Sequence, residues 1–166
     1  MTEGTQVCIM ASYPPILAAE DEETDALLLE IALSATGLRN PLVLVRDGQI
    51  VLDYLCGKPP YQDRLLHPLP GLLLLDLKMP RMNGFDVMAW LLQRPEFQQL
   101  PVVVLSSSTN ESDMRKATEL GARDYLVKPN NFRDLTKMLQ HVAARWLGDT
   151  ARVATFEQAG HKHMAL

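Results

Sequence analysis

Side chains able to handle a phosphoryl group or a metal ion follow four apolar runs of this 166-residue chain. They are Glu20 and Asp21 after the first run, Asp76 after the third, Ser106 after the fourth and Lys128 after the fifth. If the runs are parallel strands, their carboxyl ends meet at one edge of a sheet, where open α/β folds bind ligands. We therefore expect side chains from distant parts of the sequence to form one site.

Three carboxylates in one place need a counter-ion, because like charges at short range oppose one another's ionisation. Lys128 supplies one positive charge, and oxygen ligands without His or Cys favour Mg²⁺ over zinc as the source of the rest. A carboxylate beside Mg²⁺ can act as the nucleophile of phosphoryl transfer and form an aspartyl phosphate. Asp76 is our candidate, because the four leucines before it would fix its position. Lys128 and the Ser106 hydroxyl would bind the phosphoryl oxygens.

The elements that would carry these residues alternate between apolar runs and amphipathic stretches, which predicts an α/β fold with a parallel sheet covered on both faces. The predicted strands are 16–19, 42–45, 71–75, 102–105 and 125–127. Helical periodicity predicts helices that include 28–35, 49–55, 87–92, 110–120 and 131–147. The apolar face of the last helix comprises Phe132, Leu135, Leu139, Val142, Ala143 and Trp146. The proline-rich stretch 59–70 predicts an ordered loop, and Asp47 is expected to cap the second helix.

Composition fits one globular domain and excludes several classes of function. Hydrophobic residues make up 47% of the chain, and the net charge of -4 offers no cationic excess for a nucleic-acid backbone. Cys8 and Cys56 lack the spacing of a zinc site or a disulfide scaffold. Without a basic leader or a long apolar span, we expect a cytoplasmic protein with no membrane partner. We expect a lead-in at 1–13, one domain at 14–147 and a tail at 148–166.

Four stretches, taken in their order, closely resemble the receiver domain of two-component response regulators. They are ILAAEDEE (16–23), LLLLDLKMPRMNGFDV (72–87), PVVVLSSS (101–108) and GARDYLVKP (121–129). The resemblance covers about residues 14–147 and implies a doubly wound, five-stranded parallel sheet of flavodoxin-like order 2-1-3-4-5, with helices on both faces. The DLKMPRMNG segment and the proline-containing loop are similar to single-domain regulators that partner phytochrome-type histidine kinases.

Carried over by position, the resemblance makes Asp76 the phosphoacceptor and a ligand of the metal. Asp21 would bind Mg²⁺ directly, Glu20 would act largely through water, and the backbone carbonyl of Lys78 would complete the ligands. Glu20 stands where many relatives have Asp, and the Lys78 side chain lies where many have Asn. The effect of Lys78 on dephosphorylation therefore stays open.

The resemblance also assigns phosphoryl-binding and switch residues. Ser106, with Ser107 beside it, matches the switch hydroxyl, and Tyr125 matches the switch aromatic. Lys128 matches the lysine of the family, and Pro129 is expected to follow a cis peptide bond, which is cheap only before proline. Taken alone, Ser106 also fits a polar turn and Tyr125 also fits simple packing.

The resulting hypothesis is a phosphorylation switch that turns over no substrate other than its own phosphoryl group. A sensor histidine kinase would phosphorylate Asp76, and the added charge would draw Ser106 inward and let Tyr125 turn in. The signal would leave through the face of the fourth helix, fifth strand and last helix. The protein that binds this face would be a downstream protein, a phosphotransfer protein or a second copy of the chain in a homodimer.

Three other interpretations remain open. A receiver that no longer accepts phosphate could serve as a scaffold, although its acidic, hydroxyl and lysine positions are complete. An aspartate-based phosphohydrolase would want a second acid two residues after the nucleophile, where this chain has Lys78. A flavin or nucleotide module would need a glycine- or hydroxyl-rich phosphate loop after the first strand, where the chain has the acidic EDEE.

Overall fold

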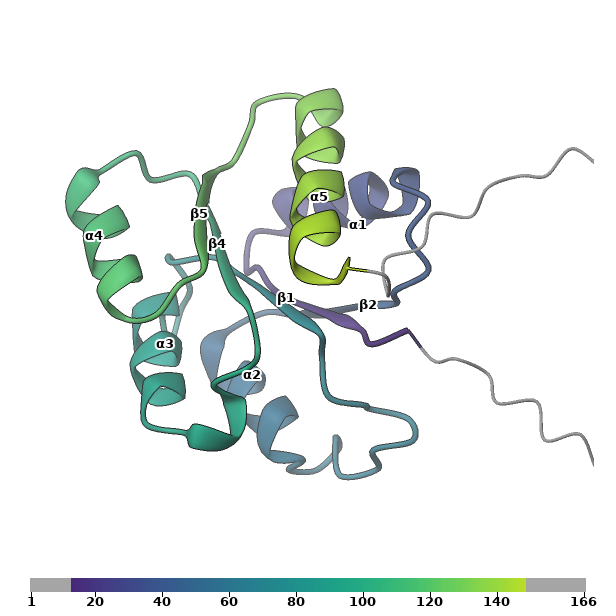
Figure 1. Cartoon of the computed structure of the whole chain (residues 1–166), viewed down its shortest axis with the longest axis vertical. Helices are drawn as coiled ribbons and strands as arrows, with labels where there is room; N and C mark the ends of the chain where they lie inside the picture. Colours follow the sequence, from purple (N-terminus) through teal and green to yellow (C-terminus); the bar gives the residue numbers. More distant parts are fainter. Residues whose placement is uncertain (1–12, 149–166) are drawn as a thin grey trace, which may run out of the picture.

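The computed structural model describes residues 13–148, and the predicted lead-in up to residue 12 and the tail from residue 149 lie outside this range. Five parallel strands form one sheet in the order β2-β1-β3-β4-β5 (Figure 1). Their bounds are β1 Ile16–Ala19, β2 Leu42–Val45, β3 Leu72–Leu75, β4 Val102–Ser106 and β5 Asp124–Val127. The predicted fold and strand order are confirmed, and each strand end lies within about one residue of its predicted place.

Helices cover both faces of the sheet, as expected. Their bounds are α1 Glu23–Ala35, α2 Gly48–Cys56, α3 Gly84–Leu92, α4 Glu111–Glu119 and α5 Phe132–Trp146, with a short 3₁₀ turn, η1, at Pro95–Phe97. Helices α1 and α5 pack against each other on one face, and α2, α3 and α4 lie on the other (Figure 1). No helix within the described range is long and apolar enough to cross a membrane.

The two central strands are buried on both faces, which anchors whatever follows them. Alternate residues of β3 enter different cores: Leu73 and Leu75 pack beneath α2 and α3, and Leu72 and Leu74 pack beneath α1 and α5. Full burial of one leucine side chain is worth about 1.5–3 kcal/mol, so the four-leucine run fixes the chain firmly just before Asp76. This is the placement that the apolar run predicts.

Side-chain caps set where two helices begin. Asp47 accepts a hydrogen bond from the Ile50 amide (2.9 Å) at the start of α2, which confirms the predicted cap. At the start of α3, Asn83 accepts from the Asp86 amide (3.0 Å), and the Asp86 carboxylate accepts from the Asn83 amide (3.3 Å). This capping box starts α3 at Gly84, before the apolar periodicity that predicted the helix.

The buried part of the apolar face of α5 begins at Leu135. Leu135, Leu139, Val142 and Ala143 are buried, but Phe132 is 41% exposed. Phe132 is the first residue of the helix and precedes the first buried residue by three positions, so it lies beyond the part of α5 that packs on the sheet. Phe132 thus belongs to the apolar stripe of α5 but is not part of its buried portion.

The proline-rich stretch between α2 and β3 is an ordered loop, as predicted. The Arg64 guanidinium donates to the backbone carbonyls of Tyr54 (2.9 Å), Leu55 (2.7 Å) and His67 (3.1 Å). The Tyr54 hydroxyl donates to the Pro68 carbonyl (2.9 Å). These bonds satisfy carbonyl groups at the end of α2 and tie the loop to that helix.

Candidate functional site

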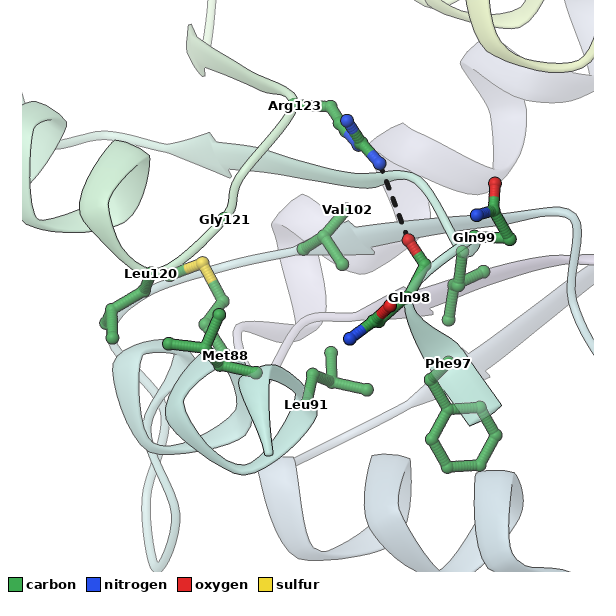
Figure 2. A pocket seen from close by; sticks show the side chains of 11 residues that line it. Met88, Leu91, Phe97, Gln98, Gln99, Val102, Leu120, Gly121 and Arg123 are labelled. Carbon is green, nitrogen blue, oxygen red and sulfur yellow. Dashed lines mark hydrogen bonds between the residues drawn. The ribbon is translucent and has the colours of Figure 1, made fainter. Parts of the chain in front are cut away.

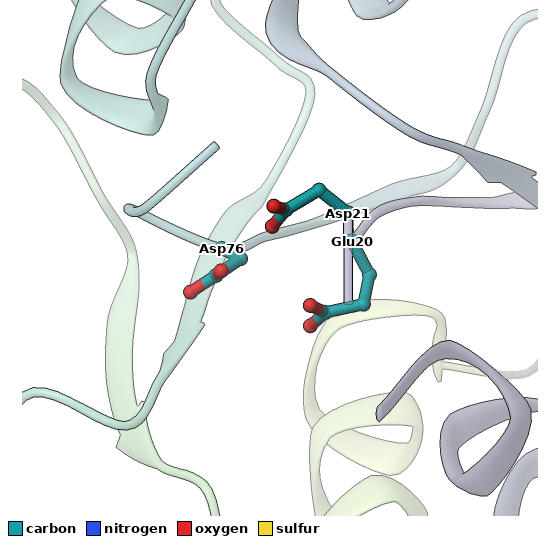
Figure 3. A group of neighbouring side chains, drawn as sticks. All are labelled: Glu20, Asp21 and Asp76. Carbon is teal, nitrogen blue, oxygen red and sulfur yellow. The ribbon is translucent and has the colours of Figure 1, made fainter. Parts of the chain in front are cut away.

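The pairing of β1 with β3 brings the three predicted carboxylates together. Ala19 and Leu75 are partners at the ends of these strands, and the Asp76 amide donates to the Ala19 carbonyl (3.1 Å). Glu20 and Asp21 follow directly and so lie beside Asp76. Each of the three residues offers a carboxylate oxygen within 4.8 Å of the others (Figure 3). The predicted convergence of these acids is confirmed.

Asp76 is enclosed by the loop that follows it. Its side chain is 8% exposed, and Oδ1 accepts a hydrogen bond from the Leu77 amide (2.8 Å). Gly84 packs so closely that a Cβ there would lie 2.4 Å from the Asp76 carbonyl oxygen, so only glycine fits. Burial raises the pKa of the Asp76 carboxyl above its ordinary value, although the Lys128 charge and backbone hydrogen bonds from Leu77 and Lys78 oppose that shift.

Lys128 is the cation of the site. Its amide donates to the Ser106 carbonyl (2.9 Å), which places the side chain just beyond the paired ends of β4 and β5. The ammonium nitrogen lies 2.5 Å from a Glu20 oxygen, 2.8 Å from an Asp25 oxygen and 3.9 Å from an Asp76 oxygen. The Lys128 side chain is only 15% exposed, so these interactions take place largely out of solvent.

The formal charge of the site is negative, because the Lys128 ammonium lies among the carboxylates of Glu20, Asp25 and Asp76. Burial by itself lowers the pKa of Lys128, but the hydrogen bonds to Asp25 and Glu20 and the charge of Asp76 raise that pKa above its ordinary value. Burial raises the pKa of Glu20 despite its bond with Lys128. One ammonium thus faces two buried carboxylates, those of Glu20 and Asp76. The donors are all oxygen, without His or Cys, which fits a hard divalent cation.

Asp25 is a member of this site that the sequence did not identify. It lies in the first turn of α1, where an acidic residue has an ordinary explanation in the helix dipole. Its hydrogen bond to Lys128 spans 103 positions of sequence. The available signal was its spacing of four residues from Asp21, one helical turn, but α1 begins only at Glu23.

The predicted switch residues meet at Ser108 rather than at each other. The buried Ser106 hydroxyl accepts a hydrogen bond from the Ser108 amide (3.2 Å), and the Tyr125 hydroxyl donates to the Ser108 carbonyl (3.0 Å). The Ser108 hydroxyl donates to Asp113 of α4 (2.6 Å). Ser107 is exposed. The sequence reasoning missed Ser108 because three consecutive serines give no pattern that separates one from the next.

Two further predictions concern backbone groups around the site. The Lys78 side chain is exposed, and its amide, rather than its ammonium, acts on Asp76. The peptide bond before Pro129 is not cis: among residues 13–148 the cis bond is Pro59–Pro60. The expectation of a cis bond there is wrong. The trans form is favoured by about 0.5–1 kcal/mol, and Lys128 reaches its carboxylate partners with it.

A cavity of about 360 Å³ lies at the opposite edge of the sheet, where β4 and β5 begin (Figure 2). It is bordered by α3, η1 and the segment after α4. Its one cationic side chain is Arg123, which donates to the Gln98 carbonyl (3.4 Å). None of the described residues that line it carries a carboxylate, so the carboxylate chemistry described above is not available in this cavity.

Comparisons with known proteins agree with this geometry. Residues 16–140 match the family model of the response regulator receiver domain. Response regulator Rcp1 of Synechocystis sp. is 37% identical over 138 residues, which cover 82% of this chain and 92% of Rcp1. The chain belongs to the response regulator receiver family, and its function is that of a receiver in two-component signalling.

Two crystal structures show what related proteins with this fold contain. The Mn²⁺-bound form of Rcp1 superposes with a TM-score of 0.72 at 34% identity and covers 86% of this chain and 99% of its own. The phosphorylated cyanobacterial phytochrome response regulator RcpA superposes with a TM-score of 0.75 at 31% identity, with the same coverage. The chain is thus homologous to regulators crystallised with a divalent metal and in a phosphorylated form.

Proposed function

We propose that Asp76 accepts a phosphoryl group from a sensor histidine kinase and that residues 14–147 form the responding unit. The observation that supports this most directly is the position of the Asp76 carboxylate. It lies within 4.8 Å of two other carboxylates and 3.9 Å from the Lys128 ammonium. A buried carboxylate with a raised pKa in such surroundings is suited to work beside a metal ion rather than to cap a turn.

In this mechanism an Asp76 oxygen attacks phosphorus in line with the leaving group. The P–N bond of the donor phosphohistidine breaks as the new P–O bond forms, and the departing imidazole takes a proton from water. Lys128 donates to the phosphoryl oxygens, as does the hydroxyl of Ser106 or Ser107. Pro129 is assigned to the same phosphoryl-binding group through its place next to Lys128.

Mg²⁺ is the metal that we assign to the acidic group. Asp21, Asp76 and the Lys78 carbonyl would bind it directly, and Glu20 would act through water. When bound, the ion supplies positive charge that neutralises the carboxylates and the phosphoryl oxygens. The surplus of buried negative charge in the protein supports this assignment, and an octahedral cation that retains water suits the small number of protein ligands.

The response begins at the shared contact of Ser106 and Tyr125 with Ser108. A phosphoryl group adds a charge of about -1.5 to -2 beside Ser106. If it draws the Ser106 hydroxyl inward, the Ser108 amide loses its acceptor, and the Tyr125 hydroxyl loses a fixed partner as the Ser108 backbone shifts. Tyr125 can then turn in, and the face of α4, β5 and α5 changes.

The partners follow from this mode of signalling. The donor would be a cytoplasmic, phytochrome-like histidine kinase. The support for this is that RcpA, a phytochrome response regulator, is 31% identical to this chain in sequence. The α4, β5 and α5 face would bind a downstream protein, a phosphotransfer protein or a second copy of the chain. We propose no nucleic-acid partner and no membrane partner.

Phosphorylation by acetyl phosphate with Mg²⁺ tests the proposal without the cognate kinase. Wild-type protein should shift on a phosphate-affinity gel, and Asp76→Asn should show no shift. Asp53→Asn, which alters an aspartate on α2 whose ion-pair partner is Lys58, should label like wild type. Undiminished labelling of Asp76→Asn would refute the assignment, and absence of labelling in the wild type would favour the scaffold interpretation.

A further inference from the structure

Asp25 and Asp76 lie at different distances from the same ammonium group, that of Lys128. Lys128 Nζ is 2.8 Å from the Asp25 carboxylate, within hydrogen-bond distance, but 3.9 Å from the Asp76 carboxylate. An ammonium group has three N–H donors, and two of them are engaged by Asp25 and Glu20. The cation that should stabilise a phosphoryl group on Asp76 is therefore bound mainly to other carboxylates.

The position of Asp25 is fixed by the packing of its helix. Asp25 lies in the first turn of α1, and the next residue, Ala26, is buried against the core, as is Leu29 one turn later. Asp25 and Lys128 line a small pocket of about 30 Å³ together with Leu28, Leu29, Leu105 and Leu135. These apolar walls keep solvent from most of the Lys128 side chain, which strengthens the attraction to Asp25.

We propose that Asp25 is a positioning residue that restrains Lys128 and so weakens the hold of the site on a phosphoryl group. This inference rests on the proposed phosphorylation of Asp76. When Lys128 turns toward phosphoryl oxygens, it must give up or lengthen its bond to Asp25. Glu20 belongs to the acidic group itself, whereas Asp25 pulls the ammonium toward α1. Asp25 thereby sets how tightly the phosphorylated state is held and how long it lasts.

The test is binding of beryllofluoride, a phosphoryl mimic, in the presence of saturating Mg²⁺. Asp25→Asn should tighten binding roughly two- to fivefold, the range expected for an ion pair with one partly exposed partner. Asp25→Glu, which keeps the charge, should bind like wild type. Glu23→Gln is the matched control, because Glu23 lies in the same helical turn and has no ion pair within residues 13–148. It should leave the affinity unchanged.

A double-mutant cycle separates restraint of Lys128 from simple repulsion between Asp25 and the anion. In a Lys128→Met background, Asp25→Asn should no longer tighten beryllofluoride binding, because the group on which it acts is gone. A full effect in that background would overturn the proposal, as would unchanged or weaker binding by Asp25→Asn alone. Phosphoryl lifetime gives a second readout: Asp25→Asn should retain the acetyl phosphate label for longer than wild type.

The same measurements distinguish failure of this inference from failure of the proposed function. If Asp76→Asn binds beryllofluoride as well as wild type, then the phosphoacceptor is misassigned and both proposals fall. If Asp76→Asn abolishes binding and Asp25→Asn changes nothing, then only the role of Asp25 is overturned. Circular dichroism melts of each variant confirm that the compared proteins are folded.

Discussion

The centre of the sheet and its margin differ in how firmly they are held. Every residue of β1 and β3 is buried, whereas all four residues of β5 are half-buried, and α4 buries a single residue, Ala117. The acids follow the central strands, and Tyr125 lies on β5. Segments with few buried apolar contacts open at a low cost in free energy. The carboxylates of the site thus follow firmly held strands, and the switch that we propose for Tyr125 lies where movement costs less free energy.

The centre of the sheet also positions two buried carboxyl groups whose ionisation costs free energy of folding. The pKa values of Glu20 and Asp76 are raised by burial, so holding both groups ionised at neutral pH opposes folding. The fully buried strands before them compensate for this cost through apolar packing. At the margin the Tyr125 hydroxyl donates to the Ser108 carbonyl, and the Asp124 carboxylate beside it is paired with the largely exposed Arg145.

The largest expected effect separates Lys128, whose ammonium lies among the carboxylates of the site, from a lysine of the margin. Lys128→Met should slow phosphorylation by acetyl phosphate about 100-fold, the usual cost of removing one group that stabilises transition-state charge. Lys116→Met on α4, which loses a contact with the Phe85 ring at 4.3 Å, should leave the rate unchanged. Initial rates on phosphate-affinity gels measure both. Equal slowing in the two variants would break the distinction between the regions.

Two glycines compare the tightness of packing in the two regions. Gly84→Ala should lower the free energy of unfolding by about 1–3 kcal/mol, because the new Cβ meets the backbone of Asp76 and Leu77. Gly121→Ala should cost only about 1 kcal/mol, the penalty for a positive φ, since nothing lies within 4 Å of its Cβ. Urea denaturation gives both values. A larger loss at Gly121 would contradict the comparison.

Because ionisation of the buried Asp76 carboxyl opposes folding, we predict that removal of its charge stabilises the folded protein. A carboxyl whose pKa is raised on folding contributes most stability below its ordinary pKa, 3.8 for Asp76, and loses it as pH rises through the raised value. The stability of Asp76→Asn relative to wild type should therefore increase from pH 4 to pH 7. At pH 7 the variant should melt about 2–4 °C higher, which corresponds to roughly 1 kcal/mol.

Mg²⁺ provides the control for this melting experiment. Because a bound divalent cation offsets the carboxylate charge, it should stabilise wild type more than Asp76→Asn and so reduce the difference between them. Differential scanning calorimetry with Mg²⁺ and with a chelator measures this. A wild type that melts higher than Asp76→Asn at pH 7 in chelator would show that the acidic group is not strained.

The smallest effect is expected at the margin. Tyr125→Phe removes one hydrogen bond, to the Ser108 carbonyl, and should lower the free energy of unfolding by about 0.5–1 kcal/mol. The rate of phosphorylation should stay at the wild-type value, because the acids and Lys128 are untouched. Thermal melts and acetyl phosphate labelling measure the two quantities. A slowed rate would show that centre and margin are coupled before phosphorylation.

The sequence predicted the features that depend on local pattern. The apolar run 72–75 predicts a doubly buried strand, and the position of Asp76 follows because the strand delivers the next residue to the sheet edge. The same logic placed Glu20 and Lys128 at that edge. Periodicity also predicted the helices, with errors only at their ends, where caps such as Asn83 rather than apolar spacing decide the boundary.

The features that the sequence did not predict depend on how helices are rotated about their axes and on contacts between segments that are distant in the sequence. Whether Asp25 faces Lys128 is set by the residue at which α1 starts and by its packing on the sheet, which no local pattern encodes. The choice of Ser108 over Ser107 as the shared contact depends on the path of the β4–α4 loop. The 41% exposure of Phe132 at the start of α5 likewise depends on how the helix packs, which its apolar periodicity does not encode.

Ala19 and Leu75 are register partners at the ends of β1 and β3, so a change in the length of β3 would displace Asp76 from Glu20 and Asp21. Side chains on a strand alternate between faces, and each residue advances the chain by about 3.3 Å. Deletion of a single leucine from the run 72–75 would turn the following carboxylate to the other side and retract it from its neighbours. The geometry of the acidic group therefore depends on the exact number of residues in β3.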